Sequence, residues 1–562
     1  MILKMVDLKA SLDLFIGVDV GTASMRTAVV NNTGTIVATV SRPIRIWQSE
    51  GGIFEQSSEN IWSECCAAMK EAMEGLDASQ IKGIGFDATC SLVAMDTNFQ
   101  PITVSKSGDN QRNIVMWMDH RASDQAAEIN TTKHDVLRYV GGTISLEMQP
   151  PKLLWLKQNL RAKCWDRAGH FFDLPDYLTW RATGTLSRSL CSVVCKWTYQ
   201  ADQTGRTEWS DSFWEEIGLG DLKEKNYAKI GATVLSPGEP VGSGLTNQAA
   251  AELGLLPGTP VGTSIIDAHA GGLGVLGADV SRCGMSNDDV TMKSRLALIS
   301  GTSSCHMAIS KEPTFVPGVW GPYFSAMVPG YWLNEGGQSV SGKLIDHVIE
   351  SHPANQTLKT EAANNGVTVY QHLFNLLESM SASQRTASMA ELTRDLHIWP
   401  DFHGNRSPLA DSSLKGMISG LSLSTSINDL AVLYLATVQA IAHGTRHIIS
   451  SMEGAGHRIS MVFACGGLSK NQLFVQTHAD VTGLPIVLPK ESESVLIGAS
   501  LLGARASGWF PTVQDAMQSM GGAGDVIRPD SKTKQFHDRK HRVFLKMVDD
   551  QRGYRSIMKE LH

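Results

Sequence analysis

The sequence predicts an α/β protein of two lobes, each built on a mixed β-sheet flanked by helices. Two observations carry this prediction. The first is a strand–turn–strand pattern, FIGVDV-GTAS-MRTAVV, at residues 15–30. The second is a matching pattern about 280 residues later, RLALISG-TSSC-HMAIS, at residues 295–310. A duplicated domain with one hairpin in each half would produce such a repeat, and a chance likeness of two turns is the alternative.

Composition supports a globular protein of several folding units. The chain has 562 residues, of which 42% are hydrophobic and 19% charged, and its net charge is −7. This balance excludes a wholly disordered or fibrous chain, and no overall positive field is available for nucleic acid or an anionic membrane. No apolar run of eighteen residues predicts a membrane span. The N-terminus lacks the apolar core and small-residue cleavage site of a signal peptide, which favours the cytoplasm.

The elements that follow the first hairpin also predict a mixed sheet. NNTG turns the chain into a third strand, TIVATV, at 35–40. A helix then begins at Ser57 or Ser58, with apolar residues at helical spacing, and IKGIGFDA (81–88) reads as a buried strand. Three antiparallel strands followed by a helix and a strand differ from the β-α-β start of a dinucleotide-binding fold.

The second half is predicted from similar signals. Residues 355–395 are polar with helical stretches, typical of an insertion or a lid, whereas 429–452 form a long, nearly apolar helix that we expect to be central. RISMVFACGG (458–467) reads as a strand that precedes another helix. The last thirty residues indicate a surface helix rather than a nucleic-acid arm. We therefore expect an N-terminal domain, a C-terminal domain and a helical extension, at residues 13–280, 290–510 and 511–562.

The nine cysteines are scattered without C-x-x-C pairs, which favours reduced thiols in a cytosolic protein. Cys191 and Cys195 are four residues apart, but no histidine cluster accompanies them in the sequence. We therefore predict buried thiols there rather than a zinc site.

Two nucleotide-binding patterns are set aside. GLGVLG (272–277) matches G-x-G-x-x-G, but it falls within a predicted helix rather than at a strand-to-helix turn. GQSVSGKL (337–344) nearly matches a P-loop, but Leu344 replaces the Ser or Thr that must reach magnesium.

The two repeated turns are better candidates for phosphate binding. Gly21 would let backbone amides approach a phosphate, and Thr22 and Ser24 add hydroxyl donors. Asp19, at the end of the preceding strand, could hold magnesium through water. A plain hairpin is the alternative for either turn alone, but two facing hairpins could clamp a triphosphate.

Asp267 is the candidate catalytic residue. It ends the apolar run PVGTSIID, so its carboxylate would point into a cleft, where general-base work or metal binding becomes available. A helix N-cap is an equal alternative. Trp117 and Asp119 in WMDHRA, and Glu335 in NEGGQSVSGK, are types that hold sugars, although each segment alone favours a structural role.

Taken in order, these segments resemble the FGGY family of carbohydrate kinases. The resemblance covers roughly residues 13–510 and rests on GVDVGTAS, WMDHRA, LPDYLTWRATG, IIDAHAG, SGTSSC, WLNEGGQSVSG, FHGNRSPLAD, ACGGLSKNQLFVQTHADVTGLPI and ESVLIGASLLGARASG. It implies the two-lobed actin-like, ribonuclease-H-like ATPase fold, with ATP and Mg²⁺ as cofactors.

The resemblance also implies roles for the matching positions. Asp267 would be the general base that acts on the sugar hydroxyl, and Asp19 would lie on the magnesium side. The phosphate contacts would be Gly21, Thr22, Gly301 and Thr302, and the adenosine turn Gly466, Gly467 and Asn471. The ketopentose would be held by Trp117, Asp119, Lys196 and Glu335, of which Lys196 rests on the short stretch CSVVCKW.

Within the family, TCSLV (89–93) resembles a stretch typical of the eukaryotic D-ribulokinase subgroup, which would bring Thr89 to the sugar. This implies phosphorylation of D-ribulose, with an L-ribulokinase or another pentulose or pentitol kinase as the nearest alternatives. Cys465 departs from the family, since many members carry a third glycine there.

One alternative belongs to another class. The same fold serves actin-like or chaperone-like ATPases, in which nucleotide turnover drives movement without a sugar. Asp267, Trp117 and Glu335 together favour the kinase. Its expected partners are a small sugar and ATP, with no nucleic acid or membrane, and a homodimer stays open.

Overall fold

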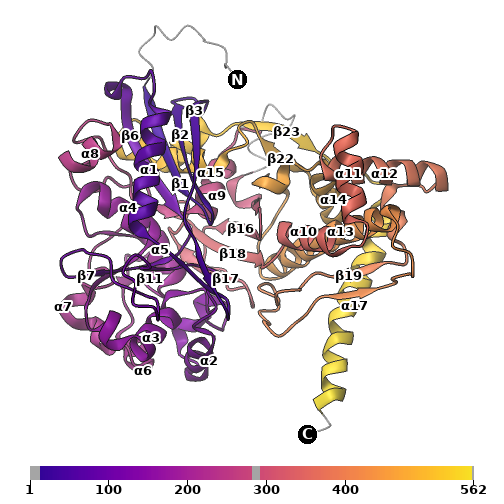
Figure 1. Cartoon of the computed structure of the whole chain (residues 1–562), viewed down its shortest axis with the longest axis horizontal. Coiled ribbons are helices and arrows are strands. Elements are labelled where there is room, and N and C mark those ends of the chain that lie inside the picture. The colour runs from indigo at the N-terminus through magenta and orange to yellow at the C-terminus, as the bar shows by residue number, and fades with distance from the viewer. Residues whose placement is uncertain (1–12, 281–290, 560–562) are drawn as a thin grey trace.

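The structure, a computed structural model, describes residues 13–280 and 291–559. The two lobes lie side by side in Figure 1, the first mainly indigo and magenta and the second orange and yellow. Three sequence predictions fall outside the described residues: the lack of a leader at residues 1–12, the thiol of Cys283, and the start of the second domain at residue 290.

The first lobe is built on a five-stranded sheet in the order β14-β6-β1-β2-β3. The strands are β1 (Leu14–Val20), β2 (Ser24–Asn31), β3 (Ile36–Pro43), β6 (Ile81–Ala88) and β14 (Ile265–Ile266). The first three pair antiparallel, whereas β6 runs parallel to β1 and β14, which confirms the predicted mixed sheet. Helix α1 (Ser58–Ala72) packs on β2 and β3, and Ser57 is its N-cap.

The second lobe repeats this arrangement within a seven-stranded sheet, β17-β18-β16-β15-β21-β22-β23. Its strands are β15 (Arg295–Ser300), β16 (Ser304–Ser310), β17 (Trp320–Phe324), β18 (Trp332–Gln338), β21 (Met461–Cys465), β22 (Ile486–Pro489) and β23 (Ala523–Ile527). β15, β16 and β18 pair antiparallel, whereas β15, β21 and β22 run parallel. The order and directions of β3-β2-β1-β6-β14 thus recur in β18-β16-β15-β21-β22. The predicted duplication is confirmed, and the two matching turns are no coincidence.

Two glycine-rich helices lie between the lobes: α9 (Asp267–Leu276) and α15 (Ser494–Ala506). They pack against each other, and α15 also packs on β1 and β6, although it comes late in the chain. The contact is too close for larger residues, since a Cβ on Gly498 would lie 1.9 Å from the carbonyl oxygen of Ala270. The GLGVLG sequence is helical, as predicted, and starts within α9. The late helix α15 therefore shares its core with the first lobe, across the predicted domain boundary.

A third sheet, in the order β4-β5-β8-β7-β9, completes the first lobe, and the sequence prediction missed it. Its strands are β4 (Trp47–Ser49), β5 (Ile53–Gln56), β7 (Leu92–Asp96), β8 (Ile114–Val115) and β9 (Ala168–Asp173). The helices of this lobe are α2 (Ser123–Thr132), α3 (Gln149–Asn159), α4 (Leu174–Thr183), α5 (Leu190–Lys196), α6 (Asp211–Glu216), α7 (Glu224–Tyr227) and α8 (Asn247–Leu253). Three short strand pairs are β10 (Arg188–Ser189) with β13 (Val234–Leu235), β11 (Gln200–Ala201) with β12 (Thr207–Glu208), and β19 (His397–Trp399) with β20 (Met417–Ser419), the last in the second lobe.

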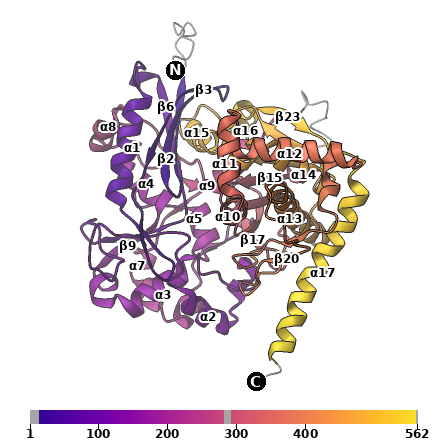
Figure 2. The same ribbon diagram turned by 45° about the vertical axis from the view of Figure 1, so that its right-hand side comes forward.

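The predicted long helix is confirmed as α13 (Ile427–Gly454), and its residues Leu430 to Met452 are largely buried. Around it pack α10 (Gly342–Ser351), α11 (Asn355–Asn364), α12 (Val369–Gln384) and α14 (Gln472–Thr482). The polar segment 355–395 forms α11, α12 and a short 3₁₀ turn on the outer side of the second lobe (Figures 1 and 2).

The tail contains α16 (Val513–Met520), β23 and α17 (Lys534–Lys559). It is therefore not wholly helical, because β23 extends the second sheet by pairing antiparallel with β22. The surface helix predicted for the last thirty residues is present as α17, whose far end projects beyond the second lobe in Figures 1 and 2. Within the described ranges, no helix has the length and hydropathy that a membrane crossing requires.

Candidate active site

A cavity of about 220 Å³ lies between the lobes, where the two repeated hairpins face each other. Ten of the residues predicted from the sequence line it: Asp19, Gly21, Thr22, Thr89, Trp117, Lys196, Asp267, Gly301, Thr302 and Glu335. They come from segments spread over more than three hundred residues, so their convergence is a product of the duplicated fold.

The hairpin turns form matching rims of the cavity. In the first, the Gly21 N–H donates to the Ser24 carbonyl at 3.0 Å, and in the second the Gly301 N–H donates to the Ser303 carbonyl at 2.9 Å. Each turn therefore leaves its hydroxyl-bearing residue, Thr22 or Thr302, at the cavity. Such turns offer the backbone amides and hydroxyls that suit phosphate oxygens.

Three aspartates meet at the carboxyl ends of adjacent strands. Asp19 is the last residue but one of β1 and is paired in register with Asp87 on β6, and Asp267 follows β14. Burial, and then the nearby charge of Asp19, raises the pKa of Asp267 to about 7. The same two causes raise the pKa of Asp87 well above its usual range. Asp19 is held by Arg26, whose Nε donates to Oδ2 at 2.8 Å.

The opposite side of the cavity is dominated by cations. Arg406 donates to Glu335 at 2.6 Å, and the ammonium of Lys196 lies 4.3 Å from the ring centre of Trp320. Burial alone would raise the pKa of Glu335, but Lys196, His269 and Arg406 outweigh it and lower the pKa to about 2. Glu335 is therefore ionised at every physiological pH, and its carboxylate can accept hydrogen bonds from hydroxyl groups.

Trp117 connects this cationic side of the cavity to the first hairpin turn. Its indole Nε1 donates to Thr22 Oγ1 at 3.1 Å, while its backbone N–H is held by Ser91 Oγ. Ser91 follows Thr89 in the TCSLV stretch, and Thr89 and Cys90 both line the cavity. The segment thus lies at the predicted pocket.

Five predicted residues do not line this cavity: Asp119, Ser24, Gly466, Gly467 and Asn471. Asp119 is fully buried, where it accepts hydrogen bonds from the Phe54 N–H and from Arg121. Its position orients the WMDHRA segment from behind.

The turn predicted for adenosine lies next to the second phosphate turn. Gly466 has φ +92°, and a Cβ there would lie 2.4 Å from the carbonyl oxygen of Ser300. Asn471 caps α14 by accepting from the Phe474 N–H, and its amide donates to the Tyr434 hydroxyl at 2.7 Å. Cys465, which departs from the family pattern, is fully buried at the end of β21.

The sequence prediction missed Arg26, Asp87 and Arg406. Arg26 lies two residues after the first turn, and Arg406 lies in the FHGNRSPLAD segment. Their positions in these segments were a weak indication that each could reach the site. Asp87 ends the strand predicted at 81–88, but nothing in the sequence indicated that β6 would lie beside β1 in this register.

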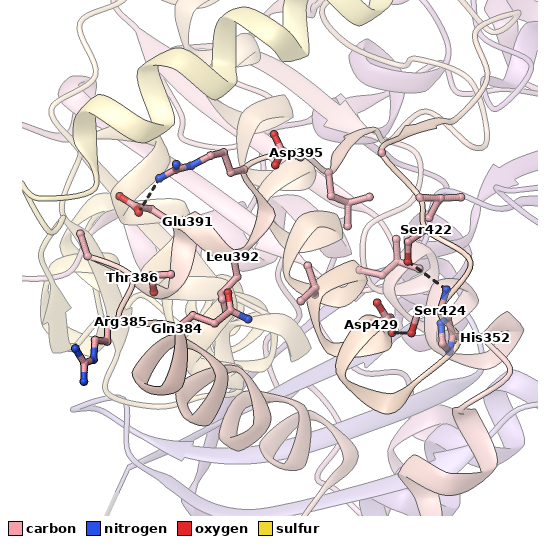
Figure 3. A pocket seen from close by; sticks show the side chains of 17 residues that line it. His352, Gln384, Arg385, Thr386, Glu391, Leu392, Asp395, Ser422, Ser424 and Asp429 are labelled. Carbon is pink, nitrogen blue, oxygen red and sulfur yellow. Dashed lines mark hydrogen bonds and ion pairs between the residues drawn. The ribbon is translucent and has the colours of Figure 1, made fainter.

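Two larger cavities lie elsewhere. One, of about 600 Å³, opens beside the first and shares Glu147 and Arg406 with it. The other, of about 850 Å³, lies in the second lobe between the end of α12 and the start of α13 (Figure 3). Gln384 and Asp395 line this second cavity, so the segment 355–395 borders it and not the interlobe cavity. The position of this segment does not support the predicted lid.

Cys191 and Cys195 are buried and unpaired, as predicted. However, His269 of α9 lies against them, with Cys195 Sγ 3.7 Å from its Nε2. The lack of a neighbouring histidine holds only along the sequence, because the lobe folds α5 against the segment that carries His269.

The chain matches known proteins over almost all of its length. Family models described as the FGGY family of carbohydrate kinases, N-terminal and C-terminal domains, match residues 14–274 and 296–507. It is 58% identical to a human FGGY carbohydrate kinase domain-containing protein, over 97% of this chain and 98% of the human one. It is 39% identical to a D-ribulokinase of Saccharomyces cerevisiae, over 93% of this chain and 75% of the yeast protein.

Solved structures share the fold. A xylulose kinase from Rhodospirillum rubrum superposes with a TM-score of 0.76 at 20% identity, covering 96% of this chain and 99% of that one. A Plasmodium falciparum glycerol kinase with ADP gives 0.73 at 15% identity, covering 95% and 98%. The predicted two-lobed fold is therefore confirmed.

Proposed function

Because this chain belongs to the FGGY family of carbohydrate kinases, we propose that it transfers the γ-phosphoryl group of ATP to D-ribulose, giving D-ribulose 5-phosphate. The observation that carries the proposal is the interlobe cavity. In it, Asp267 lies between two hairpin turns suited to phosphate and a wall of charged side chains suited to sugar hydroxyls. The similarity to a yeast D-ribulokinase supports the choice of D-ribulose, and 30% identity to a ribulokinase of Shouchella clausii supports a ribulose of either configuration.

Asp267 acts as the general base. The primary hydroxyl of the sugar gives its proton to the carboxylate, its oxygen forms a bond to the γ-phosphorus, and the bond to the β–γ bridging oxygen breaks, releasing ADP. A carboxylate with a pKa of about 7 suits this work, because it is substantially ionised at neutral pH yet basic enough to take a proton.

The sugar is held on the cationic side of the cavity. Glu335, kept ionised by Arg406 and Lys196, accepts sugar hydroxyls, while Trp117 presents an apolar ring to the carbon skeleton. Thr89 adds a hydroxyl next to the same face. Asp119 acts through the segment that it orients, because it is buried behind the cavity.

The nucleotide lies across both turns. Gly21 and Thr22 from one lobe, with Gly301 and Thr302 from the other, contact the phosphates, and the turn at Gly466, Gly467 and Asn471 receives the adenosine. Ser24 does not line the cavity, and its carbonyl closes the first turn instead. Placing one turn on each lobe lets ATP and sugar together draw the lobes closed, which excludes water from the phosphoryl group.

The aspartate corner fits a divalent cation. Both carboxylate oxygens of Asp87 are buried without a hydrogen-bond partner, directly beside Asp19. Hard oxygen donors of this kind suit Mg²⁺, so Asp19 would hold the ion, with Asp87 behind it. Asp267, the other aspartate predicted to bind metal, would lie beside the ion but stay free to take the proton. When bound, Mg²⁺ supplies charge that offsets the developing negative charge on the phosphates.

The eight described cysteines are all free, which supports a cytoplasmic location.

The test is an ADP-release assay across D-ribulose, L-ribulose, D-xylulose, the pentitols, glycerol and buffer alone. D-ribulose should give the highest kcat/KM. A clear preference for L-ribulose or D-xylulose would reject the substrate and keep the kinase. Rapid ATP hydrolysis without any sugar would favour the conformational ATPase instead.

A further inference from the structure

A cluster of two thiols and an imidazole lies behind the sugar-binding side of the cavity. Cys191 and Cys195 occupy successive turns of α5, and His269 faces them from α9. One ligand atom from each of the three residues lies within 4.8 Å of the others, and all three side chains are fully buried. Donor atoms of a tetrahedral zinc site lie about 3.5–3.8 Å apart, so a contraction of about 1 Å at most would let the three share one ion.

We infer that this cluster is a binding site for a soft divalent cation, Zn²⁺ foremost. Two sulfur donors and an imidazole favour Zn²⁺ over Mg²⁺ or Ca²⁺, which prefer oxygen. Binding replaces the two thiol protons with metal–sulfur bonds and releases the protons to solvent. Three protein ligands leave a fourth position open.

His269 is prepared to act as a ligand. Its Nδ1 is buried without a hydrogen-bond partner, and its Nε2 lies 3.7 Å from Cys195 Sγ.

The fourth position connects the cluster to the sugar side. Glu335 Oε2 lies 3.4 Å from His269 Nε2 and is buried without a hydrogen-bond partner, while its Oε1 binds Arg406. A cation beside His269 would attract this free oxygen and hold it away from the sugar. The site is thus inhibitory, and Zn²⁺ should raise the KM for the sugar. Binding itself is independent of the proposed function, and only this kinetic effect rests on it.

The binding test uses the full-length protein after dialysis against a chelator, titrated with Co²⁺ as a coloured substitute for Zn²⁺. One equivalent per chain should bind and give sulfur-to-cobalt charge-transfer absorption, which Zn²⁺ abolishes by displacement. Cys195→Ser and His269→Asn should each weaken binding at least tenfold. Cys164→Ser removes an equally buried free thiol outside the cluster and should leave the spectrum unchanged.

Thermal unfolding checks that each variant is folded. If neither cluster variant folds, the Co²⁺ spectrum of the parent protein alone decides whether thiolates bind the ion. Two results would contradict the proposed site. One is Co²⁺ binding without the sulfur-to-cobalt absorption, and the other is the same absorption in a folded Cys195→Ser variant. In the kinetic arm, Zn²⁺ should raise the sugar KM of the parent and of Cys164→Ser several-fold, reversibly with chelator, but not that of Cys195→Ser. Equal inhibition of all three would reject the inhibitory role even where the binding stands.

Discussion

The two sides of the interlobe cavity treat the same kind of side chain in opposite ways. On one side, Asp267 lies near the negative charge of Asp19, and its pKa rises to about 7. On the other, Glu335 is even more deeply buried but faces Lys196 and Arg406, and its pKa falls to about 2. Burial alone would push both upward. The neighbours therefore decide which carboxylate can take a proton and which stays charged to bind.

The largest effect should come from removing the base. Asp267→Asn keeps the shape and the hydrogen bond from the Ala268 N–H but cannot accept a proton. We expect turnover to fall by about 10²–10⁴, with sugar binding nearly unchanged. Single-turnover kinetics and calorimetric sugar binding measure the two, and Asp346→Asn in the second lobe serves as control. A variant that keeps more than a tenth of the parent turnover would contradict the assigned role.

Glu335→Gln removes the negative charge on the cationic side of the cavity. It leaves Lys196 and Arg406 buried without their counter-charge, which should cost about 3–5 kcal/mol of unfolding free energy and raise the sugar KM. Urea unfolding and steady-state kinetics check the two effects. The control is Glu208→Gln, which breaks an exposed pair with Arg206 and should change stability by about 0.5 kcal/mol or less. Equal stability of the two variants would show that the cations are not paired as described.

The pH–rate profile sharpens the contrast. Since the general base must be ionised, kcat/KM should fall about tenfold per pH unit below about pH 7. Glu335 should add no second limb, because it stays ionised down to about pH 2. If kcat/KM instead fell only below about pH 4 and showed no change near pH 7, the pKa of Asp267 would not be raised in the folded protein.

Stability should respond to pH with opposite signs at the two residues. The folded pKa of Asp267 lies above its unfolded value of about 3.9, so between about pH 4 and 7 the folded state holds more protons, and this residue lowers stability as pH rises. Glu335 stabilises above its unfolded pKa of about 4.3, and that contribution is lost as pH falls toward 2. Unfolding curves of the parent and of Asp267→Asn test this, because the variant should lose the first dependence and keep the second.

A smaller effect should follow from disturbing the helix that begins at Asp267. In Gly498→Ala the new Cβ would meet the Ala270 carbonyl oxygen of α9, which must shift. We expect a loss of about 1–3 kcal/mol of unfolding free energy and a lower kcat. Gly454→Ala, where nothing lies within 4 Å, is the matched control. If both variants behave alike, close packing of α9 and α15 does not position the base.

The smallest effect is expected at the second phosphate turn. Thr302→Val deletes one hydroxyl and roughly preserves shape, so the KM for ATP should rise by about 2–13-fold, the cost of one hydrogen bond. The sugar KM should stay constant. Thr360→Val on exposed α11 is the control. If Thr302→Val changed the sugar KM and left the ATP KM unchanged, the second turn would not contact the nucleotide.

The sequence by itself determined the hairpins, their repetition, the mixed sheets and the family, because alternating apolar residues and glycine turns are local signals. It also located Asp19, Asp267 and Glu335, which stand in recognisable segments. Tertiary structure alone decided the neighbours: Asp87 beside Asp19, Arg406 on Glu335, and His269 against Cys191 and Cys195. Those contacts join residues far apart in the chain, and a pKa depends on burial and charge in space. The sequence therefore identified the two carboxylates, and only the packing of the two lobes raised the pKa of Asp267 and lowered that of Glu335.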